Sequence, residues 1–453
     1  MKKISAGFLT VCVMFGAAYF ISPGFALCIL LSAAFYYLVC RNTVGSDRRF
    51  VLFVVSVAIL LRVACLILLQ YKCFSLNQLD IFGDAQDNII QGINISESIR
   101  NMKDIPVTPQ SILSSRYNTH SMTLFNGIYF LLFGNDIVSL KYLNVLAISA
   151  TAWLIYDIAK KIYSSMAGRI ALVIVLFWPT VFLWSITDLK ESHLLFTLTC
   201  AFWCLGRSAE AKRRIGKAAL IMLSALFAFY FVLLKIKLMM PIFILFVSII
   251  TLYNVLYYGF SRNSALTRKM LYISIISAVA VMYKFGDRIS QAIKGSYELI
   301  LHYHIGFLNS GGWNVDLIGD KSQNFFTVQF IAQYVAKAWF FFFLEPLPWH
   351  FYSYSLMATY PIMLVWYIIV AFSIVGVIRV HYEGRAREVF AMLVFSAIYI
   401  TVVGMSVANI GTIIRFRDVM LPVVAVFAAI GISGMSGMPR MPRATEERCR
   451  NTK

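Results

Sequence analysis

Charged residues are scarce in this chain of 453 residues: Asp, Glu, Lys and Arg together make up 13% of it, with only 21 acidic residues against 40 basic ones. Soluble domains carry about 25% charged residues. With 60% hydrophobic residues, the composition excludes an ordinary soluble protein and predicts a polytopic membrane protein that contacts membrane lipids. The net charge of +19 does not indicate a nucleic acid partner, because the basic residues lie in short segments between apolar runs, where they set membrane orientation.

Signatures of common soluble enzymes are missing as well. The eight cysteines show no zinc-type pairing, and most of them lie inside apolar runs, so neither a metal site nor a disulfide framework is expected. No HExxH, GxSxG or phosphate-loop motif occurs in the chain. The sequence therefore predicts no metal and no cofactor.

Apolar runs recur along the chain, some long enough to cross a bilayer and others that need flanking residues to do so. They predict an all-α protein with about 12 transmembrane helices in one domain, 1–435, followed by a basic cytoplasmic tail, 436–453. The first run is taken as a retained span, because 23–26 makes a poor signal-peptide cleavage site. The predicted spans lie near 4–20, 24–40, 50–70, 137–160, 170–184, 192–206, 218–234, 238–258, 270–283, 355–378, 389–407 and 419–433.

The placement of basic residues predicts the topology. With the N-terminus in the cytoplasm, more than half of the 40 Lys and Arg residues fall in short cytoplasmic segments, as the positive-inside rule requires. The long polar stretches 71–136 and 284–354 then lie on the outer face. Within them the apolar runs 121–133 and 325–344 are too short or too interrupted to cross, so juxtamembrane helices along the interface are predicted.

The polar stretch after the third span contains two carboxylates, Asp84 and Asp87. If the stretch is helical, residues three apart share one face, and the pair is placed to act as a general base. The alternative is structural: Asp84 caps a helix that begins near Ala85, since Asp is among the best N-caps.

A second outward turn carries Asp188, Lys190 and Glu191. A helix that starts here would welcome an anionic group of a substrate at its N-terminus. The alternative is a capping box, in which Thr187 or Asp188 is the N-cap and Glu191 completes the motif.

Cations outside the positive-inside pattern need a separate reason. Arg415 and Arg417 precede the last span and suit a phosphate or pyrophosphate, because guanidinium groups bind phosphate oxygens in bidentate fashion; the alternative is anchoring to lipid headgroups. Lys235 and Lys237, in an outward turn, are open to the same two interpretations. Arg62 lies inside the third apolar run and needs a partner that the sequence does not name.

Taken together, several of these motifs resemble the GT-C glycosyltransferases, in particular bacterial members that are similar to dolichyl-phosphate-mannose protein mannosyltransferases. Two of the motifs, near Pro346 and Asn409, look like patterns in uncharacterised relatives from surface-polysaccharide loci. The resemblance spans most of the chain. Its motifs are Gly83-Asp84, the stretch from Lys141-Tyr142-Leu143-Asn144 to Ile158-Ala159-Lys160-Lys161-Ile162-Tyr163, Trp178-Pro179, Asp188-Leu189-Lys190-Glu191, Pro346-Leu347-Pro348-Trp349 and 409–417.

The resemblance implies a GT-C-like helix bundle in a bacterial inner membrane, with its active face outward. It implies a sugar donor on a polyprenyl phosphate carrier and transfer with inversion to a glycan or lipid-linked acceptor in cell-surface polysaccharide assembly. The family's acidic base or acceptor-positioning residue in the first outward loop falls on Asp84. Two features depart from the family: Asp87 is three positions away instead of adjacent, and no soluble C-terminal domain follows the spans, which leaves the acceptor open.

The resulting hypothesis is that Asp84 deprotonates or orients an acceptor hydroxyl while Arg415 and Arg417, with Lys235 or Lys237, neutralise the leaving phosphate. Two alternatives stay open. A polysaccharide polymerase or ligase would use an undecaprenyl-linked substrate of the same class. A lipid-linked sugar flippase or transporter would show charged residues within spans and repeated halves, and only Arg62 fits that expectation.

Overall fold

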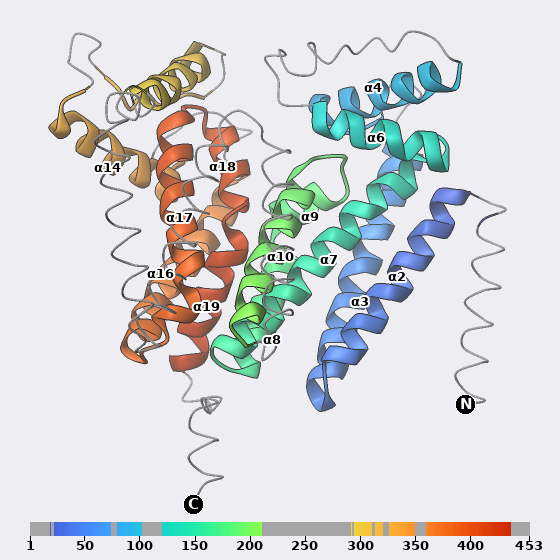
Figure 1. Cartoon of the computed structure of the whole chain (residues 1–453), viewed down its shortest axis with the longest axis horizontal. Coiled ribbons are helices and arrows are strands. Elements are labelled where there is room, and N and C mark those ends of the chain that lie inside the picture. The colour runs from blue at the N-terminus through green and yellow to red at the C-terminus, as the bar shows by residue number, and fades with distance from the viewer. Residues whose placement is uncertain are drawn as a thin grey trace, which may run out of the picture. The chain divides into compact units, whose positions relative to one another are not determined.

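A computed structural model describes the chain at residues 19, 22–73, 79–101, 120–210, 291, 294–309, 313–319, 326–347, 349 and 359–435. In these ranges the regular structure is helical, with a single isolated bridge in place of any strand (Figure 1). Five of the described helices are long and apolar enough to cross a membrane, or up to seven if each of two bent pairs is one span. The chain is therefore an all-α membrane protein, as the composition predicts.

The predicted spans can be compared with helices one by one. Eight of them fall in the described ranges, and each corresponds to a helix or to a bent helix pair. The runs at 218–234, 238–258 and 270–283 lie outside the described residues, and of the run at 4–20 only residue 19 is described. The predicted juxtamembrane segments are helical as well: α6 covers His120–Phe133 and α14 covers Val328–Leu344.

The chain divides into two compact units, each described here by itself. Unit 1 comprises 1–234, 368–386 and 421–453, and unit 2 comprises 235–367 and 387–420. Unit 1 contains α2 (Pro23–Asn42), α3 (Gly45–Leu68), the π-helix η1 (Leu69–Cys73), α4 (Gly83–Arg100), α6, α7 (Ile137–Ile162), α8 (Ser165–Phe177), α9 (Pro179–Ser185), α10 (Glu191–Glu210), α19 (Leu421–Met435) and most of α16 (Tyr360–Tyr382). Unit 2 contains α14, α17 (Ala386–Ser406), α18 (Ile410–Asp418) and a helix over 294–309.

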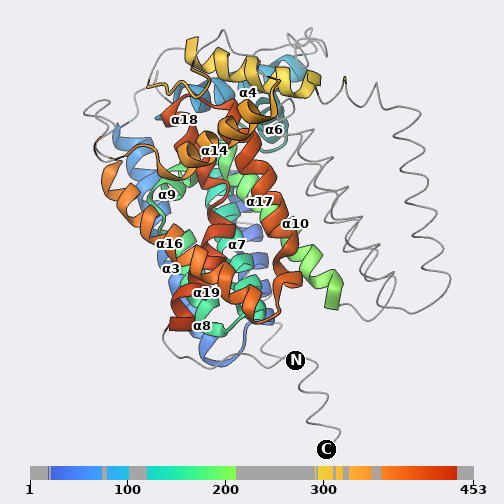
Figure 2. The ribbon, with the colours of Figure 1, turned by 90° about the vertical axis from the view of Figure 1, so that its left-hand side faces the viewer.

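Helix α7 is the central element of unit 1. It packs against α2, α3, α8, α10 and α19, and both views place it among them (Figures 1 and 2). Most of its residues are buried by these neighbours, including the polar side chains of Lys141, Asn144 and Asp157. Its start is fixed by Asp136, which caps the helix by accepting from the Ser139 N–H at 3.0 Å and also accepts from the Ser22 hydroxyl, the cap of α2, at 2.6 Å. The two helices therefore begin from one shared polar contact.

Helices α4 and α6 lie across the end of this bundle where α7 begins (Figure 1). They pack closely because glycine occupies the crossing point: a Cβ atom at Gly92 of α4 would come within 2.6 Å of the Asn126 Cβ of α6. An apolar cluster of Ile89, Tyr129, Phe130 and Leu140 then joins both helices to α7. This packing fixes the position of α4 on the bundle.

Arg62, whose partner the sequence does not reveal, stabilises the bend between two helices that together form one broken span. Helices α8 and α9 meet at an angle of 61°, where Pro179 starts α9 and cannot donate a backbone hydrogen bond. Arg62 is fully buried and donates to the Leu176 carbonyl at 2.6 Å and to the Ser185 hydroxyl at 2.8 Å. Because the last carbonyls of a helix lack intrahelical partners, the guanidinium satisfies an acceptor that the break exposes.

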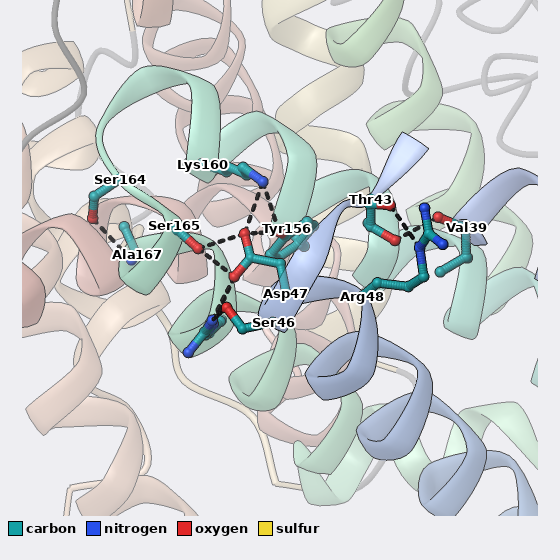
Figure 3. A network of polar contacts seen from close by, with 11 residues as sticks. Val39, Thr43, Ser46, Asp47, Arg48, Tyr156, Lys160, Ser164, Ser165 and Ala167 are labelled. Carbon is teal, nitrogen blue, oxygen red and sulfur yellow. Dashed lines mark hydrogen bonds and ion pairs between the residues drawn. The ribbon is translucent and has the colours of Figure 1, made fainter. Parts of the chain in front are cut away.

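At the opposite end of unit 1, one carboxylate ties three helices together (Figure 3). Asp47, in the first turn of α3, accepts from Tyr156 at 2.8 Å and Lys160 at 2.8 Å, both on α7. It also accepts from the Ser165 hydroxyl at 2.6 Å and the Arg169 guanidinium at 2.6 Å, both on α8. Two cations share this carboxylate, which explains how a charged group is kept in a mostly buried position.

Replacing Asp47 by Asn is expected to lower the free energy of unfolding by about 2 kcal/mol, since hydrogen bonds to charged groups contribute about 1.5–3 kcal/mol. The cost stays moderate because Lys160 and Arg169 keep 20% and 29% of their side-chain surface exposed and can hydrate. Chemical denaturation in detergent micelles measures the change. The control is Ser46→Ala, which removes one exposed contact with Arg169; equal losses in both variants would show that Asp47 is no anchor.

In unit 2, the segment 313–315 is joined to the turn between α17 and α18. Val315 donates its N–H to the Ala408 carbonyl at 2.9 Å, and Ile410 donates to the Trp313 carbonyl at 2.9 Å. The Asn409 amide adds a bond to Asn314 at 3.1 Å. This pairing attaches the start of α18 to a segment about a hundred residues earlier in the chain.

Candidate functional site

Five buried polar residues meet in unit 1 below α4 and α6, and we call them the buried polar centre. Asp80 precedes α4, Asn126 lies on α6, Lys141 and Asn144 lie on α7, and Asp188 lies in the turn between α9 and α10. None is more than 1% exposed. Buried polar groups are costly unless they are hydrogen-bonded, so their mutual contacts decide what the centre can do.

Asp80 and Lys141 form its ion pair. The Lys141 ammonium lies 3.1 Å from Asp80 Oδ2, and both side chains are essentially excluded from solvent. The ammonium also donates to the Leu79 carbonyl at 2.7 Å, while the Ile81 N–H donates to Asp80 Oδ1 at 2.7 Å. The pair therefore fixes the backbone of residues 79–81 against α7.

Asp188 completes the centre from the α9–α10 turn. Its N–H donates to Asp80 Oδ2 at 3.0 Å, and its carboxyl accepts from the Asn126 amide. The Asn144 amide donates to the neighbouring Thr187 carbonyl at 2.6 Å. Burial raises the pKa of Asp188 to about 7; the Asn126 amide and the Lys141 ammonium oppose this rise, and the Asp80 carboxylate adds to it.

The local sequence explains how these residues converge. Lys141 and Asn144 are three apart on α7 and therefore share one face of the helix. The α9–α10 turn is formed by Thr187, whose hydroxyl donates to the Leu183 and Trp184 carbonyls of α9 at 3.2 Å. The Trp184 ring packs 5.3 Å from that of Phe82, which holds the segment before α4 against α9.

The predicted catalytic pair, Asp84 and Asp87, lies on the first turns of α4 and is exposed. The segment is helical, so both carboxylates lie on neighbouring positions of one helix. The alternative that Asp84 is the N-cap of this helix is wrong, because the helix begins one residue before Asp84. The helix begins at Gly83 and its N-cap is Phe82, without a side-chain cap bond, so Asp84 is inside the first turn. A carboxylate in this position interacts favourably with the positive end of the helix dipole.

The predicted binding residues of the second turn have separate environments. Asp188 is buried in the polar centre, and Glu191 is fully buried at the first position of α10, while Lys190 is half-buried just before it. The capping-box alternative is also wrong, because that motif needs Glu191 at the third helical position instead of the first. The substrate-binding role expected of this turn finds no support in the Asp188 and Glu191 side chains, because neither faces solvent.

The two predicted phosphate ligands of unit 2 differ from each other. Arg415 of α18 is half-buried. Arg417 is 2% exposed and donates to the Phe342 carbonyl at 2.7 Å and to the Glu345 carbonyl, at the C-terminal end of α14. Its guanidinium lies 5.4 Å from the Trp366 ring centroid. Because its donors are used by protein acceptors, the geometry favours a structural role for Arg417 over phosphate binding.

Two predictions remain: the binding role of Lys235 and Lys237, and the absence of a metal site. Lys235 and Lys237 lie outside the described residues. Within the described part of the chain, no three His, Cys, Asp or Glu side chains are grouped so that they could hold a metal ion. The buried polar centre offers two carboxyls, and the ammonium of Lys141 lies beside one of them.

Sequence reasoning missed Asp80, Asn126 and the role of Lys141. One signal was available: a lysine inside the apolar run 137–160 requires a partner, just as Arg62 does. The preceding polar segments contain several acidic residues, among them Asp80, Asp84 and Asp136, and the spacing does not distinguish between them. Asn126 gives no such signal, because an amide in a short apolar helix is common.

No protein-family model, no curated protein and no solved structure matches this chain.

Proposed function

We propose that this chain is a membrane glycosyltransferase with a GT-C-like bundle of about 12 transmembrane helices. It moves a sugar from a polyprenyl-phosphate-linked donor to a glycan or lipid-linked acceptor at the outer face of a bacterial inner membrane. The proposal combines the resemblance of the sequence motifs with the geometry around α4.

One observation carries the proposal: Asp84 is an exposed carboxylate on a rigidly held helix start. A general base must reach the acceptor hydroxyl and still keep a fixed position. Exposure gives Asp84 the access. The ion pair of Asp80 with Lys141 and the contact of Phe82 with Trp184, both within four residues upstream, give it the fixed position.

In the proposed reaction, the Asp84 carboxylate removes the proton of the acceptor hydroxyl while the hydroxyl oxygen attacks the anomeric carbon of the donor sugar. The bond from that carbon to the phosphate oxygen breaks, and polyprenyl phosphate leaves with the electron pair, so the configuration inverts. Cationic groups stabilise the charge on the leaving phosphate; Arg415, Lys235 and Lys237 are the sequence-based candidates. Arg417 is left out because its guanidinium binds backbone carbonyls.

The structure weakens the argument for a transporter. The sequence feature that favoured it was Arg62 within a span, since charged residues in spans often mark a transport path. Arg62 instead bonds to the Leu176 carbonyl and the Ser185 hydroxyl at the break between α8 and α9. That break accounts for the charge without any transported substrate.

Proteoliposomes separate transfer from transport. The purified chain is reconstituted with a polyprenyl-phosphate donor carrying a radiolabelled sugar, and lipid and glycan fractions are offered as acceptors. We expect label to move from the donor to a new product as free polyprenyl phosphate accumulates. Movement of intact donor between leaflets without cleavage of the sugar–phosphate bond would instead identify a flippase. Growth of a polymer on the lipid carrier would identify the polymerase alternative.

A further inference from the structure

The buried polar centre holds more carboxyl groups than cations. Asp80, Asp188 and Lys141 are each 1% exposed or less. If both carboxyls were ionised, the single ammonium would leave one negative charge without compensation in a region closed to water. Such a charge is strongly disfavoured, and a buried group in this situation neutralises by binding a proton.

The hydrogen bonds show which carboxyl is neutral. Asp80 accepts from the Lys141 ammonium, from the Ile81 N–H and from the Asp188 N–H. Three donors, one of them charged, stabilise the ionised form of a carboxylate. The carboxyl of Asp188 accepts from one neutral amide, that of Asn126. The proton therefore belongs on Asp188.

The other titratable groups near this turn are Lys190, Glu191 and His193, and none of them is among the groups that act on Asp188. The charged groups that act on Asp188 are Asp80 from the segment before α4 and Lys141 from α7, and the group contributed by α6 is the neutral Asn126. On its own segment, Lys190 is half-buried and Glu191 is buried at the start of α10. A further buried carboxyl in Glu191 adds no positive charge that would favour an ionised Asp188.

We infer that Asp188 is a proton-binding site, which holds its proton near neutral pH and, in this neutral form, joins the α9–α10 turn to α6 and to the segment before α4. Loss of the proton places an uncompensated carboxylate beneath the start of α4. The inference does not rest on glycosyl transfer, because it concerns the charge state of the folded chain. It makes Asp188 a positioning residue for α4, not a group that contacts substrate.

The direction of the pH effect follows from linkage. Burial raises the pKa of Asp188 from an ordinary value of 3.8 to about 7 in the folded chain. The folded state therefore binds this proton more tightly than the unfolded state. The contribution of this proton to the free energy of unfolding is fully present below about pH 4. It declines as the pH rises and is lost once the pH passes through 7.

The test compares full-length wild type with Asp188→Asn, which imitates the neutral carboxyl, by thermal unfolding in detergent micelles at pH 5 and pH 8. We expect the variant to melt slightly higher than wild type at pH 5 and several degrees higher at pH 8, because the contribution of the proton declines progressively between about pH 4 and pH 7. Because both proteins share every other titratable group, the difference isolates Asp188. A variant that melts lower than wild type at pH 8 would show an ionised, favourably paired Asp188 and would overturn the inference.

Two further measurements keep the result interpretable. Asp80→Asn is expected to lower the melting temperature at both pH values, because it leaves Lys141 buried without its counter-charge.

Infrared difference spectra of the wild type between pH 5 and pH 8 should show the carbonyl band of a buried carboxylic acid disappearing with a midpoint near 7, and Asp188→Glu should shift that band. If Asp188→Asn does not fold, absence of the band in the wild type still refutes the proton site.

Discussion

Replacing Lys141 by Met is expected to lower the free energy of unfolding by about 3–5 kcal/mol, because removing one partner of a buried ion pair leaves the other charge unpaired. Asp80 has almost no solvent to replace the ammonium, since its side chain is 0% exposed. Met fills a volume similar to that of the lysine stem, so the loss comes from the charge and not from a cavity. Equilibrium denaturation in detergent micelles measures it.

A matched control lies on the same helix. Lys161 of α7 pairs with Asp157 at 3.5 Å, but its side chain is 29% exposed. Exposed pairs contribute about 0–1 kcal/mol, so Lys161→Met should cost far less than Lys141→Met. The double variant Lys141→Met with Asp80→Asn should recover part of the loss, because it removes both charges together. Equal costs at Lys141 and Lys161, or no recovery in the double variant, would contradict a buried ion pair.

Much of the helical framework could be predicted because hydrophobicity is a local property of the sequence. The run 137–160 became α7 with a shift of two residues at its end, and the short run 121–133 became α6. The 170–184 run was predicted as one span, and the structure breaks it into α8 and α9 at Pro179. Proline marks a possible break, but the sequence does not say that Arg62, more than a hundred residues earlier, will stabilise the bend.

The candidate site was predicted less completely, because pairings over long separations leave no trace in composition or spacing. Asp80 and Lys141 are 61 residues apart, and the Asp80–Asp188 contact spans 108 residues. The sequence identified the turn at 188–191 as polar and as a candidate substrate-binding segment. It could not show that the Asp188 side chain is buried. Likewise, two arginines one residue apart looked equivalent, whereas α18 turns Arg417 toward the carbonyls of α14 and leaves Arg415 half-buried.

Replacing Asp84 by Asn is expected to reduce transfer by about 10²–10⁴-fold while expression and stability stay near wild type. General base catalysis contributes an effect of this size, and an amide of the same shape cannot accept the proton. Asp84 is exposed in the first turn of α4, where the interaction of its charge with the helix dipole contributes about 0.3–1 kcal/mol, so a small change in stability is expected. Single-turnover transfer assays in proteoliposomes, with unfolding curves on the same preparations, measure both quantities.

Glu97→Gln is the matched control for this substitution. Glu97 is an exposed carboxylate on the same helix, and the change removes one negative charge from α4 just as Asp84→Asn does. If the loss in Asp84→Asn came only from the altered charge of α4, both variants would lose activity alike. We expect Glu97→Gln to retain nearly full transfer and Asp87→Asn to fall between the two, because Asp87 lies beside Asp84 on the helix. Full activity in Asp84→Asn would remove it as the base, and the exposed carboxylate would then be only a favourable charge at the start of α4.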